Sequence, residues 1–146
     1  MKVKLNFNTH ATVARIKSAA DAGLNAAVDT AMEDTSKYVP HGETGNLKAS
    51  GIIHREPGKV QLVWEQPGAR YLYYSFLMVS PTTKSAWAKK GEKKIIKKPL
   101  KELNLTKGRN SKARKLWAHY AESIHGEQWK EVLQRVFKLN MEKGGK

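Results

Sequence analysis

The sequence contains no cysteine among its 146 residues, which excludes disulfide bonds and thiolate metal sites and is typical of a protein made in a reducing cytoplasm. Long apolar runs are also missing, since none approaches the roughly 18 residues of a membrane span. The first seven residues alternate apolar and polar side chains, which argues against a signal peptide. We therefore expect no membrane partner. The length predicts one domain over 1–146, with a core that is stable without covalent cross-links.

Patterns that would mark a catalytic or cofactor site are equally scarce. The histidines are His10, His41, His54, His119 and His125. His119 and His125 lie six residues apart, whereas a helical zinc pair needs a spacing of three or four, so we expect histidines that face solvent or an interface. No nucleophile elbow, phosphate loop or Rossmann glycine set occurs. The sequence predicts no enzyme, no bound metal and no cofactor.

Charge is abundant but concentrated in one segment. The formal net charge is +14, and residues 84–115 carry 13 basic and 2 acidic side chains, so most of the excess lies in 32 residues. The rest of the chain is close to neutral. A protein that binds nucleic acid as a whole more often spreads its charge over a folded face. The pattern indicates a basic loop insertion, over about 80–110, mounted on a near-neutral body.

Hydrophobic periodicity predicts two long helices. Residues 2–7 have the alternation of a short strand, and a helix then runs from Asn8 or Thr9 to about Tyr38 with an alanine-rich apolar stripe. Pro40 ends it, because the residue before a proline disfavours the helical region. A second helical pattern extends from Ser111 to about Leu139, with a kink or break expected at Gly126, and a frayed tail follows over 140–146.

Between the helices the pattern is that of a small antiparallel sheet. Thr44 is placed to cap a single turn over 45–49, and strands over 51–55 and 59–65 flank a type II turn at Pro57-Gly58. A short helix over 69–75 and a further strand over 76–79 follow. Ile95-Ile96 is an apolar island suited to a strand or a clasp. The fold class is α+β: long helix, small sheet with a short helix, basic loop, long helix.

The tryptophans and lysines are the candidates for binding. Trp64 and Trp117 stand at core positions of their elements, whereas Trp87 lies inside the basic loop, where it either anchors a neighbouring subunit or stacks on a base. The anchor is the favoured interpretation. The loop lysines are Lys89, Lys90, Lys93, Lys94, Lys97 and Lys98. They suit either an acidic partner surface or DNA phosphates, but the scarcity of arginine argues against sequence-specific reading of DNA.

Several short motifs together resemble a family of tailed-bacteriophage structural proteins, the minor capsid or tail-component proteins. The matching positions are Pro40, Thr44-Gly45-Asn46-Leu47, Ser50, Val63-Trp64, Ala69-Arg70, Tyr73-Tyr74 and 112–117. The likeness covers about residues 8–137 and is weakest over 80–110. Two positions depart from the family pattern: Gly68 stands where the family has tyrosine, and Ser75 where it has glycine, so the geometry of 66–76 is the part most open to change.

The resemblance implies a non-enzymatic head–tail connector or tail-completion protein. Such proteins form a ring, typically sixfold, around the DNA channel in the virion neck, between the head-side stopper and the tail terminator. They are synthesised in the host cytoplasm. Arg70, Tyr73 and Tyr74, with Trp87 and the loop lysines, are then the candidate assembly residues, and contact with channel DNA stays open. The alternative is a small basic protein that binds nucleic acid without sequence preference.

Overall fold

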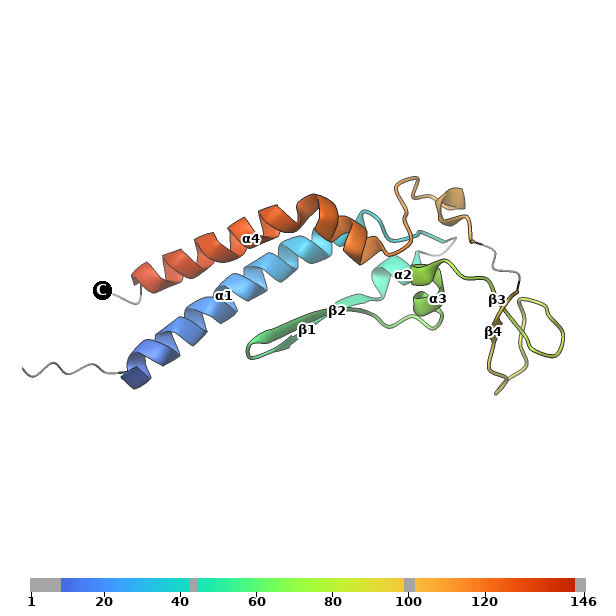
Figure 1. Ribbon diagram of the computed structural model, residues 1–146, viewed down its shortest axis with the longest axis horizontal. Coiled ribbons are helices and arrows are strands. Elements are labelled where there is room, and N and C mark those ends of the chain that lie inside the picture. Colours follow the sequence, from blue (N-terminus) through green and yellow to red (C-terminus); the bar gives the residue numbers. More distant parts are fainter. Residues whose placement is uncertain (1–8, 43–44, 99–101, 144–146) are drawn as a thin grey trace, which may run out of the picture.

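The computed structural model describes residues 9–42, 45–98 and 102–143 and has the α+β architecture that the sequence predicts. Two long antiparallel helices, α1 (Thr9–Ser36) and α4 (Trp117–Lys143), occupy one end of an elongated molecule (Figure 1). The other end holds the short strands β3 (Met78–Val79) and β4 (Ile95–Ile96). The strand expected over 2–7 lies outside the described residues.

Helix α1 packs closely on α4 because its contact face is built from small residues. Ala19, Ala27 and Ala31 are buried along this helix. At Gly23 the approach is tightest, since a Cβ there would lie 2.7 Å from the carbonyl oxygen of Leu133. The alanine-rich stripe therefore functions as the expected close-packing surface.

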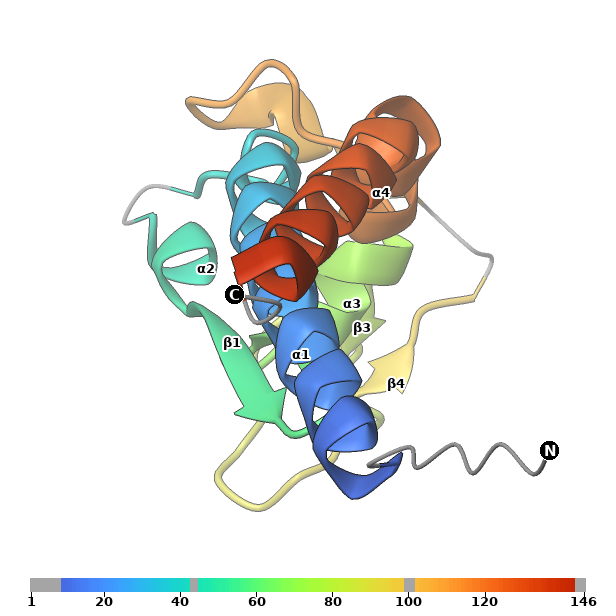
Figure 2. The same cartoon turned by 90° about the vertical axis from the view of Figure 1, so that its left-hand side faces the viewer.

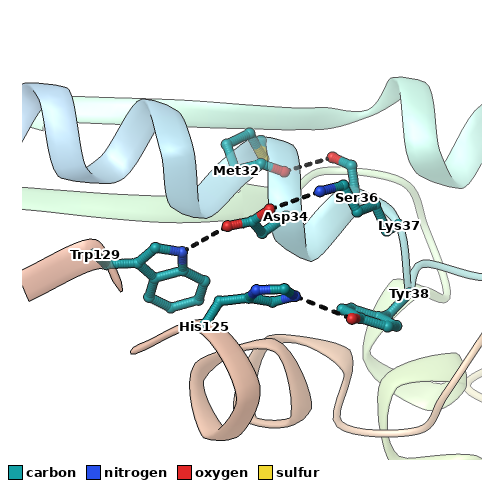
Figure 3. A network of polar contacts seen from close by, with 7 residues as sticks. All are labelled: Met32, Asp34, Ser36, Lys37, Tyr38, His125 and Trp129. Atoms are coloured by element: carbon teal, nitrogen blue, oxygen red, sulfur yellow. Dashed lines mark hydrogen bonds and ion pairs between the residues drawn. The ribbon is translucent and has the colours of Figure 1, made fainter. Parts of the chain in front are cut away.

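Buried polar groups also join the two helices (Figure 3). The Asp34 carboxylate accepts hydrogen bonds from the Trp129 indole at 2.9 Å and from the Lys37 ammonium at 2.7 Å. Burial is the largest influence on the Asp34 pKa and raises it, but these two bonds and the nearby His125 outweigh it and leave the pKa below its usual value. Tyr38 and His125 share a further bond of 3.1 Å, so this histidine has a partner within its own chain.

A β-hairpin covers the side of α1 opposite α4 (Figure 2). Strands β1 (Gly51–Glu56) and β2 (Lys59–Trp64) pair antiparallel, with Glu56 opposite Lys59. Gly58 has a φ of 72°, as the second central residue of a type II turn requires. Its N–H donates to the Asp21 carboxylate on α1, and this bond ties the hairpin tip to the helix.

The core lies where α4 begins and meets the short helices α2 (Asn46–Ala49) and α3 (Ala69–Tyr74). Val39, Leu47, Ala69 and Trp117 form its buried centre. Trp117 is 1% exposed, and half-buried Trp64 packs on it edge to face with ring centroids 5.7 Å apart. The core positions predicted for these two tryptophans are confirmed.

Two predictions about the last helix are wrong. It begins at Trp117 rather than Ser111, because the N–H groups of Arg114 and Leu116 bond to the carbonyls of Tyr38 and Tyr73 instead of to helical partners. The helix is continuous through Gly126, so of the two expected alternatives the break does not occur, and the ribbon bends in its N-terminal part (Figure 1). It also continues to Lys143, so residues 140–143 are helical and not the frayed tail expected there.

The backbone is left-handed on both sides of α3, at the two positions that depart from the family pattern. Gly68 precedes the helix with a φ of 88°, and Ser75 follows it with a φ of 62°. Serine is costly in this region, but the Ser75 hydroxyl donates to the Leu103 carbonyl and accepts from the Leu103 N–H. These contacts hold the strained residue in place, and it is fully buried.

Candidate functional site

We define the clasp as residues 76–98, which comprise β3, β4 and the loop between them. Met78 pairs with Ile96 and Val79 with Ile95 in an antiparallel ladder. The clasp lies at the far end of the molecule from the start of α1 and the end of α4 (Figure 1). The apolar island at Ile95-Ile96 thus closes the basic loop as a strand.

One carboxylate organises the loop of the clasp. Glu92 accepts hydrogen bonds from the hydroxyls of Ser80 at 2.7 Å and Thr82 at 2.8 Å, and from the N–H of Lys89 at 3.0 Å. The Ser80 bond, followed by those from Lys89 and Thr82, lowers the pKa of Glu92 to about 2. Glu92 therefore stays ionised at neutral pH and holds both sides of the loop together.

Ser80 is the second organising residue. It is fully buried, and its Oγ accepts the N–H groups of Thr82 at 3.2 Å and Thr83 at 3.1 Å. The predicted basic loop is therefore held by defined local bonds. The sequence did contain a signal: Glu92 is the only carboxylate in the stretch 76–98, with hydroxyl side chains at 80, 82, 83 and 85.

A groove of about 1000 Å³ opens between α3 and the clasp, and we call it the cationic groove. Its cations are Arg70, Lys84, Lys94, Lys97 and Lys98. Its apolar lining includes Tyr71, Tyr74, Phe76, Met78, Ile95 and Ile96. The exposed fraction is 48% for Tyr74 and 44% for Ile95, so much of this apolar surface is open to solvent. None of the described residues that line the groove carries a carboxylate.

The structure separates the predicted assembly residues into three sets. Arg70, Tyr74, Lys94, Lys97 and Lys98 meet in the cationic groove. Trp87, Lys89, Lys90 and Lys93 lie on the exposed loop outside it, and Trp87 is 87% exposed. The lysines of both sets belong to the clasp, whereas Arg70 and Tyr74 belong to α3.

Tyr73 makes up the third set, because its side chain turns toward the core. Its ring packs edge to face on Trp117 with centroids 4.7 Å apart, and its hydroxyl bonds to the His119 ring. Burial raises the pKa of Tyr73. We therefore assign Tyr73 a packing role and not the interface role expected from the sequence.

Sequence reasoning missed Tyr71 and Lys84 as members of the groove. Tyr71 and Tyr74 are three residues apart on α3, a spacing that places both on one helix face. The short helix was predicted over 69–75 and α3 spans Ala69–Tyr74, so this spacing could have identified Tyr71. Lys84 has a φ of 55°, a turn geometry that the sequence pattern does not reveal.

The remaining motif residues build the turn before the hairpin. Gly45 caps α2 with a φ of 69°, and a Cβ there would lie 2.7 Å from the His41 ring. Leu47 and Pro40 are buried, while the Ser50 hydroxyl donates to the Leu47 carbonyl at 2.7 Å. Thr44, the expected cap, lies outside the described residues. These residues stabilise the core, whereas the candidate binding residues lie in the cationic groove and the clasp.

The described ranges 9–42, 45–98 and 102–143 hold neither a cluster of metal ligands nor a helix suited to spanning a membrane. Within them, no three histidine or acidic side chains gather in a way that could hold a metal ion. None of the helices described there is long and apolar enough to span a membrane. No protein-family model, curated protein or solved structure matches this chain.

Proposed function

We propose that this protein is a structural component of a phage neck, where it forms a ring at the head–tail junction and joins the DNA-filled head to the tail. Its partners would be further copies of itself, six in the typical ring, with the head-side stopper and the tail terminator on either side. The motif resemblance suggests this role. The clasp supports it, because an assembly protein needs surfaces that the monomer leaves uncovered.

The observation that carries the proposal is the exposure of Trp87. A tryptophan that is 87% exposed leaves a large apolar surface in water, and tryptophan is the residue type most enriched at binding hot spots. The Glu92 and Ser80 bonds order the loop that presents it. Pre-ordering lowers the entropic cost of docking. The loop therefore suits contact with a neighbouring neck protein.

The test is complementation of a phage that encodes this chain. Its gene is disabled, and the variant Trp87→Ala/Lys89→Ser/Lys90→Ser is supplied from a plasmid. Deleting 84–101 would also remove β4 and Glu92, so substitution at the exposed loop is the cleaner change. We expect filled heads and separate tails in electron micrographs of the lysate, with a loss of infectious particles of at least tenfold.

A matched control is Lys17→Ser/Lys59→Ser, which removes the same two charges from exposed positions on α1 and the hairpin. It should yield normal virions. Normal virions from the Trp87 variant, or equal defects in both, would refute the proposal. A lysate in which the disabled gene causes no joining defect would do so as well.

Nucleic-acid binding is the second candidate, because 13 basic and 2 acidic residues fall within 84–115 and Trp87 is exposed among lysines. An aromatic side chain in such a setting can stack on a base. Binding through about six phosphates would lower the affinity for duplex DNA by roughly a thousandfold between 50 and 200 mM salt. A purified protein that shows this slope and never assembles would favour the second candidate.

A further inference from the structure

The lining of the cationic groove defines the chemistry of what fills it. Five cations and an exposed apolar surface contributed by Tyr71, Tyr74, Ile95 and Ile96 face the same space. The complementary surface needs an exposed apolar side chain with carboxylates about one or two helical turns away. Such an occupant removes apolar area from water and brings opposite charges together.

The chain itself carries a surface of this kind. Outside the groove and the clasp, the exposed large apolar side chains of the described residues are Val13, Ile16, Ile124 and Leu139. Lys17 follows Val13 and Ile16. Leu139 has Glu142 three residues away, but Arg135 and Lys143 each lie four residues away, so its surroundings are net basic. Ile124 differs, because Glu127 and Glu131 follow it at three and seven residues.

These three residues share the outward face of α4, which we call the Ile124 face. At 100° per residue, Glu127 and Glu131 lie within about 60° of Ile124 around the helix, while Trp129 and Leu133 lie roughly 140–180° away, on the α1 side. Ile124 is 50% exposed, and the Glu127 side chain is 85% exposed. Glu127 pairs with Lys130 at 3.0 Å, but an exposed pair of this type stabilises little and exchanges readily.

We propose that the cationic groove of one copy receives the Ile124 face of a second copy. This inference rests on the proposed function and identifies the contact between neighbours in the ring. The two surfaces belong to different elements, so the contact is heterologous: a docked pair leaves one groove and one Ile124 face free for further copies. Such contacts close into a ring when the rotation per subunit allows it. Since both surfaces are charged, the association weakens as salt rises.

The test uses two variants that each lack one surface. Lys94→Glu/Lys97→Glu replaces two of the five groove cations by carboxylates, and Glu127→Lys/Glu131→Lys reverses the charge of the Ile124 face. Sedimentation velocity at low salt should show oligomers for the unmodified chain and a monomer for each variant alone. An equimolar mixture of the two variants should form a dimer and nothing larger, because it contains one intact groove and one intact Ile124 face.

Matched controls carry the same charge changes elsewhere. Lys17→Glu/Lys59→Glu replaces two exposed lysines on α1 and the hairpin, and Glu33→Lys/Glu56→Lys replaces two exposed glutamates on the same elements. Both should assemble as the unmodified chain does. Circular dichroism of all variants separates lost contacts from lost folding. Ile124→Asp, a change at a half-exposed site, should give a folded monomer and confirm the apolar part of the contact.

The outcomes separate this contact from the proposed function. Oligomers that persist in both reversed variants overturn the contact, as does a mixture that stays monomeric. An unmodified chain that remains monomeric up to about 1 mM also overturns it, since its dissociation constant would then be weaker than that. If such a monomer binds duplex DNA and Lys94→Glu/Lys97→Glu abolishes the binding, the groove serves nucleic acid instead. Normal head–tail joining by the Glu127/Glu131 variant, in a phage that requires the gene, would remove the contact and leave the neck function standing.

Discussion

The helix pair and the clasp differ in whether their polar and apolar groups find partners within the chain. In the helix pair, Asp34 and Tyr38 bond to side chains of α4, and the small residues of α1 lie buried against that helix. In the clasp, seven lysines accompany one glutamate, and Trp87, Ile95 and Ile96 remain exposed. One region is complete as a monomer, whereas the other is ordered but uncovered. Stability should therefore reside in the first region, while assembly depends on the second region and on the Ile124 face of α4.

The largest expected effect comes from removing one tryptophan from each region. Trp117→Ala deletes a core side chain that is 1% exposed and should lower the free energy of unfolding by about 3–5 kcal/mol. Trp87→Ala removes a ring that is 87% exposed and should change that free energy by less than about 0.5 kcal/mol. Urea unfolding followed by circular dichroism measures both. Equal losses in the two variants would erase the distinction between the regions.

The next effect tests whether polar bonds hold the helix pair. Asp34→Ala leaves the Trp129 indole N–H without its acceptor and should cost about 1–3 kcal/mol in the free energy of unfolding. Glu33→Ala, one residue earlier on the exposed side of α1, is the control and should cost less than about 0.5 kcal/mol. The Trp129→Phe variant should make the further loss from Asp34→Ala smaller. Independent, additive losses would show that this bond contributes nothing.

A third effect comes from replacing two helical glycines by alanine, which should change the free energy of unfolding in opposite directions. Gly23→Ala would place a Cβ 2.7 Å from the Leu133 carbonyl oxygen, so the helices must separate, at about 1–3 kcal/mol. Gly126→Ala meets only the Glu122 side chain at 3.5 Å and should stabilise α4 by about 0.5–1 kcal/mol. Thermal unfolding of both variants decides the signs. A stabilising Gly23→Ala change would mean that α1 and α4 do not touch there.

The smallest effect is confined to the clasp and depends on pH. Because the folded pKa of Glu92 is about 2 and the ordinary value is 4.5, its bonds are fully present above pH 4.5 and are lost as the pH falls through about 2. Protection factors of the Thr82 and Lys89 amides in hydrogen exchange should fall over this range. Glu92→Gln should lower them on the order of tenfold at pH 7, and the exposed-site control Glu56→Gln should not. Unchanged protection would contradict the role given to Glu92.

Much of the fold could be predicted from the sequence, because its elements are set by local patterns. The α1 stripe, the Pro57-Gly58 hairpin and the short helix α3 all depend on residues close together in the chain. The start of α4 could not be predicted, since Ala113 and Leu116 continue the helical spacing while their segment bonds to Tyr38 and Tyr73 instead. Hydrophobic periodicity indicates which residues are buried, but it does not indicate to which carbonyl the N–H of a buried residue donates.

The candidate site was predicted in composition but not in arrangement. Charge and the exposed position of the loop lysines follow from the sequence, as does the isolation of Trp87 among them. The division into a groove and an exposed loop depends on the β3–β4 pairing, which brings Lys94 and Lys97 beside α3 across some 20 residues. Tyr73 and Tyr74 are adjacent, yet one packs on Trp117 and the other lines the groove. The orientation of α3 determines which of the two tyrosines faces the core and which faces the groove.

The most direct test of the account is a cryo-electron microscopy map of the assembled neck, or of the purified oligomer, in which each chain can be traced. We expect a closed ring in which the clasp of every subunit is covered, with its groove against α4 of the adjacent copy and Trp87 against the next protein along the axis. The helix pair should keep the same internal bonds as the monomer. A ring held together through other surfaces, with the clasp exposed to solvent, would contradict the central claim.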